Sequence, residues 1–281
     1  MATARTATHS VRKTSLTAVL AVLGGALALL AVVSSAQSAD AAKQPAPKPT
    51  IVLVHGAWAD STGWSGVIKR LDKDGYDVLA PATPLRSLSG DAAYVASFLA
   101  QTPGPIVLVG HSYGGAVITN AAAGHDNVKA LVYIDGFAPD IGENTLALAG
   151  ADSLIPTSIE FKGFPPFGPN DVDVYIKKAN FRETFAADLP KKEAALMAVA
   201  QRPAAAATGS EPTTATAWRT IPSWYLVGRQ DRTITPAAQR FMAHRAGSTT
   251  VEIDSSHVSM ISHPDAVAEL IETAAAATAG A

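Results

Sequence analysis

The sharpest chemical signal in the chain is a serine flanked by glycines. Ser112 is the centre of Gly110-His-Ser-Tyr-Gly114, which matches the pattern G-x-S-x-G and follows an apolar run typical of a strand. Between a strand and a helix, this pattern forms a tight turn that projects the hydroxyl at the helix N-terminus. The exposed N–H groups there favour developing negative charge. The motif therefore predicts that Ser112 is a nucleophile.

A serine hydroxyl is a poor nucleophile until a base takes its proton, and the chain has seven histidines. His257 follows the last predicted strand by a short loop, which places it at the edge where the carboxyl ends of parallel strands meet. His263, just before Pro264, is the alternative base. His55 and His111 lie inside loop motifs, where we expect them to brace turns. The position after the last strand favours His257.

The base needs an acid to orient it, and this acid should lie between the serine and the histidine in chain order. Asp231 comes four residues after the predicted strand that ends at Val227. A buried carboxylate there can accept a hydrogen bond from one imidazole nitrogen, fix the tautomer and stabilise the imidazolium. Asp135 also ends a predicted strand and is the rival acid, although it could simply cap the following loop. We predict Asp231 as the acid.

Apolar, β-branched runs that alternate with helical patterns must position these side chains. The predicted strands are 51–54, 76–80, 106–109, 130–134, 224–227 and 250–253. The predicted helices are 63–74, 91–101, 114–123, 236–246 and 265–275. This alternation predicts an α/β fold with a mostly parallel, doubly wound sheet of about six strands and right-handed crossovers.

The alternation stops between about residues 137 and 217, in a segment with many prolines and with amphipathic stretches at 172–185 and 191–200. A connection of this length in a compact domain normally contains secondary structure of its own. We expect a helical cap, inserted before the predicted strand 224–227 that precedes Asp231. The cap would cover the carboxyl edge of the sheet and form the wall of a pocket there. Candidate lining residues, each of which could instead belong to the core, are Trp58, Phe137, Phe161, Phe164, Phe167 and Trp218.

The N-terminal residues 1–39 have the features of an export signal. A basic start is followed by an apolar run at 16–33 and then by small residues, which predicts cleavage and a secreted protein. The run is also long enough to span a bilayer, so an uncleaved membrane anchor is the alternative. Beyond it we expect a Pro-rich linker at 40–49, a folded domain at 50–275 and a flexible tail at 276–281.

The composition suits one globular domain, because 48% of the 281 residues are hydrophobic and 16% are charged. The chain has no cysteine, which excludes disulfides, thiolate catalysis and cysteine-ligated metals. Loss of residues 1–39 removes three basic residues and no acidic one, which changes the net charge from −2 to −5. No cluster of Lys and Arg remains in the rest of the chain, so we expect no nucleic-acid partner.

Four segments together resemble the α/β-hydrolase superfamily, in particular the compact bacterial and plant esterase branch that includes methyl-salicylate esterases and hydroxynitrile lyases. They are 54–58 (VHGAW), 110–115 (GHSYGG), 226–236 (LVGRQDRTITP) and 254–264 (DSSHVSMISHP), and the resemblance spans roughly residues 50–275. It implies the α/β-hydrolase fold in a reduced, six-stranded form, and it also places the base at His257. It further implies that the N–H of Ala57 completes an oxyanion hole whose first donor is the N–H of Tyr113, the residue after the nucleophile.

These residues lead us to expect hydrolysis of a small or medium, largely apolar carboxylic ester through an acyl-enzyme on Ser112, without cofactor or metal. The acidic limb of the rate should follow a histidine-like pKa of about 6 to 7. The alternatives are a cofactor-free perhydrolase (haloperoxidase-like) activity, with peroxide in place of water, and an idle ligand-binding protein. Val258 stands where the resembling lyases carry a lysine, which argues against lyase activity. The oligomeric state stays open.

Overall fold

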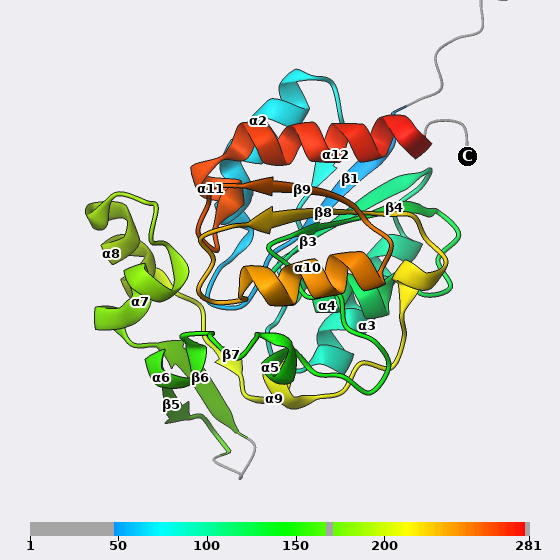
Figure 1. Cartoon of the computed structure of the whole chain (residues 1–281). Helices are drawn as coiled ribbons and strands as arrows, with labels where there is room; N and C mark the ends of the chain where they lie inside the picture. The colour runs from blue at the N-terminus through cyan, green and yellow to red at the C-terminus, as the bar shows by residue number, and fades with distance from the viewer. Residues whose placement is uncertain (1–47, 167–170, 279–281) are drawn as a thin grey trace, which may run out of the picture. The chain divides into compact units, whose positions relative to one another are not determined.

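Six parallel strands form the central sheet, in the order β2-β1-β3-β4-β8-β9 (Figure 1). In the computed structural model, which describes residues 48–166 and 171–278, these strands are β1 (Thr50–Val54), β2 (Val78–Leu79), β3 (Ile106–His111), β4 (Val128–Ile134), β8 (Ser223–Gly228) and β9 (Thr249–Ile253). Every neighbouring pair in this sheet is parallel. The predicted six-stranded α/β sheet is therefore confirmed, although β2 is shorter than the run 76–80 suggested.

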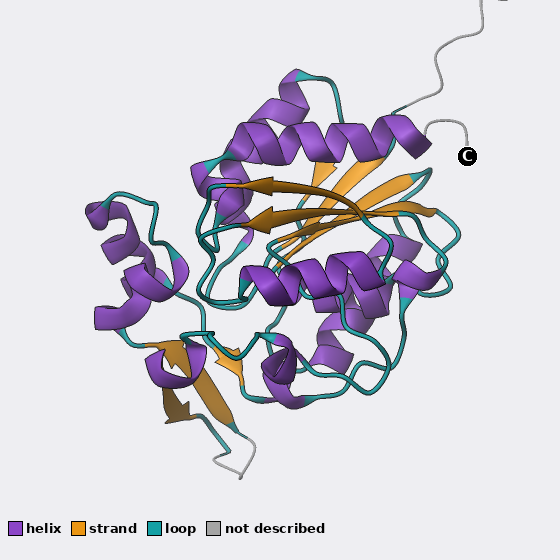
Figure 2. Ribbon diagram, viewed as in Figure 1, coloured by secondary structure: helices purple, strands orange, loops and turns teal. Residues whose placement is uncertain are grey.

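Helices cover both faces of this sheet (Figure 2). On one face lie α2 (Ser65–Lys73), α11 (Ser259–Ser262) and α12 (Pro264–Thr278), and a short 3₁₀ helix, η1 (Ser61–Trp64), precedes α2. On the other lie α3 (Leu88–Ala100), α4 (Tyr113–Ala121) and α10 (Pro236–Arg245). All five predicted helices are present. Helix α12 continues through Thr278, so residues 276–278 of the predicted tail are helical, and 279–281 lie outside the described residues.

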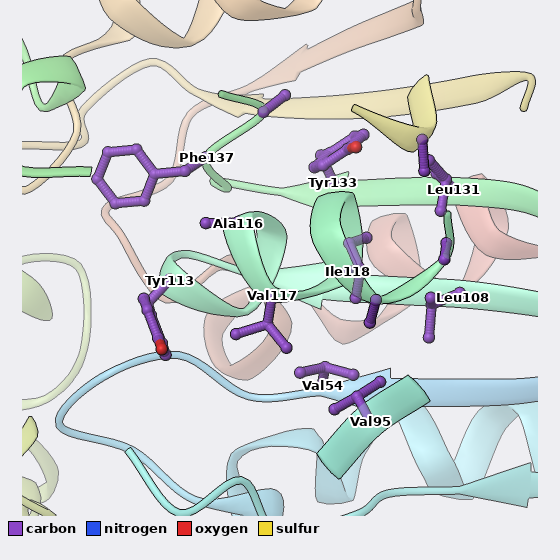
Figure 3. Close-up of a cluster of buried hydrophobic side chains, with 14 of the residues drawn as sticks. Val54, Val95, Leu108, Tyr113, Ala116, Val117, Ile118, Leu131, Tyr133 and Phe137 are labelled. Atoms are coloured by element: carbon purple, nitrogen blue, oxygen red, sulfur yellow. The ribbon is translucent and has the colours of Figure 1, made fainter. Parts of the chain in front are cut away.

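Alternate residues of the buried strands fill two separate cores. Val52 and Val54 of β1 belong to the cluster that includes α3, α4 and α10, whereas Ile51 and Leu53 belong to the cluster that includes α2 and α12. Figure 3 shows part of the first cluster, with Val54 packed beside α4. Because successive side chains of a strand point to opposite faces, a nearly continuous apolar run is what a strand covered on both sides requires.

The segment predicted as a helical cap, residues 137–217, is only partly helical. It contains the helices α5 (Thr145–Leu148), α6 (Ile155–Ser158), α7 (Lys178–Phe185), α8 (Lys191–Ala200) and α9 (Ala207–Ser210), and η2 (Ala217–Arg219) lies at its end. It also contains a three-stranded antiparallel sheet of β5 (Ile159–Gly163), β6 (Val172–Ile176) and β7 (Ala204–Ala205). The stretch 172–185 divides into β6 and α7, because apolar residues alternate in Val-Asp-Val-Tyr-Ile with the strand period.

The cap lies beyond the carboxyl ends of the sheet strands, since the arrowheads of β8 and β9 point toward α7 and α8 (Figure 1). This is the edge where parallel sheets bind ligands. The signal predicted at 1–39 and most of the linker predicted at 40–49 lie outside the described residues. Within 48–166 and 171–278, no helix combines the length and the apolarity that crossing a bilayer would need.

Candidate active site

Ser112 occupies a strained turn between β3 and α4. Its φ of 53° and ψ of −124° are unusual for a residue with a side chain, and such strain concentrates at functional sites. The flanking glycine is required by space, because a Cβ on Gly110 would lie 2.6 Å from the carbonyl oxygen of Gly114. The turn therefore holds the serine hydroxyl at the carboxyl edge of the sheet, under the cap.

Two hydrogen bonds connect Ser112 to a histidine and an aspartate from distant loops. Nε2 of His257 lies 2.7 Å from Oγ of Ser112, and Nδ1 lies 2.7 Å from Oδ2 of Asp231. His257 follows β9 and Asp231 follows β8, and all three side chains are buried. The structure thus brings together the three residues that the sequence predicted as nucleophile, base and acid.

Donors surround the carboxylate of Asp231 and orient it. Oδ1 accepts hydrogen bonds from the backbone N–H groups of Thr233 (2.7 Å) and Ile234 (3.0 Å). Oδ2 accepts from Nε2 of Gln239 at 2.7 Å, in addition to its contact with His257. Burial raises the pKa of Asp231, and the N–H groups of Thr233 and Ile234 and the Gln239 amide oppose that increase. Because these partners are donors, they stabilise the ionised carboxylate that holds a proton on Nδ1 of the imidazole.

The same burial keeps the base neutral. Removal from water lowers the pKa of His257 below its ordinary value, since the imidazolium form loses its hydration. With the proton on Nδ1, Nε2 is free to accept the proton of Ser112. The tautomer is therefore the one that general-base catalysis requires.

The rival candidates lie elsewhere. Asp135 is buried and accepts a hydrogen bond from the backbone N–H of Ser259 at 3.2 Å, at the start of α11. Burial raises its pKa, and the nearby charge of Asp231 raises it further. The side chain of His263 is 40% exposed, with Nδ1 2.9 Å from Oγ of Ser262. The structure therefore brings Asp231 and His257 to Ser112, rather than Asp135 and His263.

Both histidines expected to brace turns make such contacts. Nε2 of His55 accepts from the backbone N–H of Thr83 at 3.1 Å, and its Nδ1 lies 2.9 Å from the carbonyl oxygen of Gly56. Nε2 of His111 lies 2.8 Å from the carbonyl oxygen of His257. This second contact ties the residue before the nucleophile to the backbone of the proposed base, a link that the sequence did not indicate.

Ala57 and Tyr113, the predicted oxyanion donors, line the same cavity as Ser112. Tyr113 is the first residue of α4, where backbone N–H groups have no acceptor within the helix. Its phenol is anchored away from the reaction, because the hydroxyl donates to Oδ2 of buried Asp91 at 2.8 Å. The oxyanion role of the two amides stays a prediction, and their position beside the nucleophile agrees with it.

A cavity of about 230 Å³ opens beside Ser112, and apolar side chains from the cap form much of its wall. Of the predicted lining residues, Trp58, Phe137 and Phe161 line it, and Figure 3 shows Phe137 and Tyr113 at the same end of the core cluster. Among the described residues that line this cavity, none carries a charged side chain. The described lining of the cavity is therefore apolar and uncharged, and it is more aliphatic than the aromatic candidates suggested.

Two of the other predicted lining residues lie outside this cavity. The ring of Phe164 does not line the cavity. It lies against the guanidinium of Arg86, whose Cζ is 5.1 Å from the ring centroid. Trp218 is packed in the core, and its Nε1 donates to the carbonyl oxygen of Pro139 at 2.8 Å. Both predictions were wrong because an aromatic residue type alone does not distinguish a pocket position from a core or surface position. Phe167 lies outside the described residues.

The sequence missed most of the cap residues that form the cavity wall. These residues are small or aliphatic and come from six short cap elements and their flanks: Thr145, Leu146, Ala149, Ile155, Ile159, Val174, Ala204, Ala205, Ala206, Thr208, Gly209 and Ser210. Such residue types are equally common in any core, so their sequence carried no signal for a pocket.

Asp188 is a second omission. It lies in the cap between α7 and α8, and its carboxylate accepts hydrogen bonds from Oγ of Ser255 (3.2 Å) and from the backbone N–H of Ser256 (3.1 Å), as well as from the Ser256 hydroxyl. Burial alone would raise the pKa of Asp188, but these hydrogen bonds hold it below its ordinary value. Because Ser256 immediately precedes His257, the cap holds the loop that carries the proposed base.

Comparison with known proteins agrees with this geometry. The sequence profile of the alpha/beta hydrolase family matches residues 51–270, most of the chain. The chain belongs to this family. The match includes Ser112, Asp231 and His257, and it also spans the cap.

Relatives within the family are similar over different lengths. The "Alpha/beta hydrolase nvfD" of Aspergillus novofumigatus is 29% identical over 252 residues, which cover 81% of this chain and 97% of that protein. A "Carbendazim hydrolyzing esterase" of a Nocardioides species is 34% identical over 110 residues, or 34% of this chain and 46% of that protein. The crystal structure of polyneuridine aldehyde esterase superposes with a TM-score of 0.70 at 17% identity, over 81% of this chain and 99% of the other, and so shares the fold.

Proposed function

We propose that this member of the alpha/beta hydrolase family is a serine esterase that hydrolyses small or medium, uncharged, largely apolar carboxylic esters. The observation that carries the proposal is the hydrogen-bonded series Ser112–His257–Asp231, with both links at 2.7 Å, beside an apolar cavity. The partial similarity to a carbendazim-hydrolysing esterase supports ester hydrolysis as the reaction.

In the proposed first half-reaction, Oγ of Ser112 attacks the ester carbonyl carbon while its proton moves to Nε2 of His257. The carbonyl electron pair moves onto oxygen, and the backbone N–H groups of Ala57 and Tyr113 stabilise the oxyanion. When the tetrahedral intermediate collapses, the bond to the alkoxy oxygen breaks and that oxygen takes the proton from Nε2. The alcohol leaves, and the acyl group stays on the serine.

In the second half-reaction, water gives a proton to Nε2 of His257 and attacks the acyl-enzyme carbonyl. Collapse of the second intermediate breaks the bond to Oγ of Ser112, which recovers the proton as the carboxylic acid departs. Asp231 keeps the imidazole oriented and stabilises its charged form in both halves. No step calls for a cofactor.

The lining of the cavity determines the proposed substrate class. A charged acyl or alcohol group would lose its hydration on entering a cavity whose described lining has no charged partner. Apolar groups gain free energy from the same transfer. The enzyme should therefore discriminate against esters of dicarboxylic acids or of amino alcohols in favour of neutral esters of similar size.

The test is hydrolysis of a panel of p-nitrophenyl esters by the wild-type chain and by Ser112→Ala, together with labelling by a fluorophosphonate probe. We expect kcat/KM to fall by about five to six orders of magnitude in the alanine variant, and labelling to disappear. A wild-type chain that neither turns over the esters nor reacts with the probe would instead be an idle ligand-binding protein. An active Ser112→Ala variant would overturn the mechanism.

We also propose that residues 1–39 direct export and are then removed, on the basis of their basic start, apolar run and small-residue end. The measurement is the mass and N-terminal sequence of the protein recovered from the culture medium of an expressing cell. We expect a chain that begins near residue 40. Full-length protein in the membrane fraction would indicate an uncleaved anchor.

A further inference from the structure

A second hollow of about 310 Å³ shares Trp58 with the catalytic cavity. It is more polar, since its lining includes Asp60, Thr62, Glu193 and Gln201. Trp58 lines both spaces, and among the described residues it is the one that does so. Trp58 is therefore shared by an apolar cavity that contains the nucleophile and a second, more polar hollow.

Contacts on several sides hold this indole in place. Its Nε1 donates to the carbonyl oxygen of Val174 in β6 at 2.9 Å. The ring of Phe185 meets it edge-on, with the centroids 6.1 Å apart. A side chain with partners in both β6 and α7 cannot leave its position without breaking contacts to the cap.

The backbone at Trp58 is also strained. Its φ is 59°, in the left-handed region that a bulky residue rarely adopts. Glycine would occupy this conformation without that cost. A large aromatic residue at such a position is a local conflict that points to a functional requirement for the ring.

We propose that Trp58 is a specificity-determining residue whose indole closes one end of the catalytic cavity and so sets the maximum length of the ester. This inference rests on the proposed esterase function and deepens it. In the wild-type chain, a substrate is confined to the apolar cavity. When the indole is removed, a longer substrate extends past position 58 into the hollow lined by Met197 and Gln201.

Three substitutions at position 58 test the closure. Trp58→Gly removes the ring and relieves the strained φ, Trp58→Leu removes part of the ring volume, and Trp58→Phe keeps an aromatic ring but loses the hydrogen bond to Val174. The substrates are two series of esters, one with p-nitrophenol and acyl chains of increasing length, the other with acetate and alkyl alcohols of increasing length. The quantity measured is the ratio of kcat/KM for a long ester to kcat/KM for the acetyl or methyl member of its series.

We expect Trp58→Gly to raise this ratio by about tenfold in one of the two series, which corresponds to about two additional buried methylenes. Trp58→Leu should raise it by less, and Trp58→Phe should keep the wild-type ratio. A second substitution, Met197→Trp, refills the hollow from the α8 side. Combined with Trp58→Gly, it should return the ratio toward the wild-type value, and alone it reports any effect of its own.

The inference fails if Trp58→Gly or Trp58→Leu hydrolyses short esters yet keeps the wild-type ratio in both series. It also fails if Trp58→Phe changes the ratio as much as Trp58→Gly, since the hydrogen bond to β6 would then be the cause. If Trp58→Gly does not fold, as judged by circular dichroism, Trp58→Leu carries the same test. Failure of the esterase proposal is distinct, because the wild-type chain itself would then hydrolyse no ester of either series.

Discussion

The loops at the carboxyl ends of β3, β8 and β9 and the cap meet at the candidate active site, but they supply different groups. The loops supply the side chains of Ser112, Asp231 and His257, whose contacts require particular atoms at 2.7 Å. The cap supplies mainly volume and apolar surface, from residues such as Ile155 and Ala205. Proton transfer tolerates little change in residue type, whereas a pocket wall tolerates any residue of suitable size. Substitutions in the two regions should therefore have different kinetic consequences.

After the loss expected for Ser112→Ala, the next largest effect in this comparison should come from the acid in the loop after β8. Asp231→Asn keeps the shape of the side chain but changes its hydrogen bonding to Nδ1 of His257, which favours the wrong tautomer. We expect kcat to fall by about 10⁴-fold with little change in KM. The measurement is steady-state hydrolysis of a p-nitrophenyl ester. Asp135→Asn is the matched control, and a larger loss of kcat in that variant would reassign the acid to Asp135.

A smaller effect is expected where the cap touches the catalytic loop. Asp188→Ala removes the acceptor for the hydroxyls of Ser255 and Ser256 and for the Ser256 N–H. Small displacements of a catalytic group can cost about 100-fold in rate. We therefore expect kcat to fall by about 10- to 100-fold, with partial recovery in Asp188→Asn, whose amide oxygen can still accept.

Glu183→Gln provides the cap control for this experiment. Glu183 pairs with Arg232 at 2.6 Å, but both side chains are more than half exposed, so the pair contributes little. We expect wild-type kcat from this variant. Equal losses from Asp188→Ala and Glu183→Gln would show that the cap acts on the loops in general, rather than through Asp188.

A still smaller and more selective effect is expected in the wall of the pocket. Ala205 of β7 is buried and lines the cavity, so Ala205→Phe should reduce the volume available to the ester. We expect KM for a bulky ester to rise by about tenfold while kcat for an acetyl ester changes by less than about twofold. The comparison is kcat and KM for the two esters. A proportional loss of kcat for both would mean that this wall positions the catalytic groups as well.

The smallest change should appear in the pH profile around neutrality. Burial lowers the pKa of His257, so the neutral base persists as the pH falls through 6.5 and is lost only at more acidic values. We expect kcat/KM to stay nearly constant from pH 8 to about 6.5 and the acidic limb to lie below the ordinary histidine range. This revises the limb near pH 6 to 7 that a solvent-exposed histidine would give. An acidic limb centred above pH 6.5 would contradict the lowered pKa.

Much of the α/β core was predictable because its determinants are local. The apolar runs that became β1, β3, β4 and β8 are typical of strands covered on both faces, and the helical spacings between them are typical of helices with one buried face. The prediction was less good in the cap. In the cap, β5 and β7 pair with opposite edges of β6. Gly163 is the register partner of Val172, and Val174 is the partner of Ala204. Nothing in the sequence of these short strands indicates which strand each one pairs with. A strand of two residues, such as β7, has no periodicity to detect.

The sequence by itself determined the chemistry available to this protein. Each catalytic candidate is recognised from its place relative to a predicted strand: a serine in a glycine-flanked turn, a histidine after the last strand and an aspartate after the preceding one. In a parallel sheet the carboxyl ends of these strands lie at one edge, so the three residues are expected there. Only the tertiary structure decided between Asp231 and Asp135, because both end buried strands and the choice depends on which carboxylate meets the imidazole. It also decided that Asp188 accepts hydrogen bonds from the loop of His257 and that Trp58 lines two hollows. Such contacts join residues far apart in the chain, so local sequence does not indicate them.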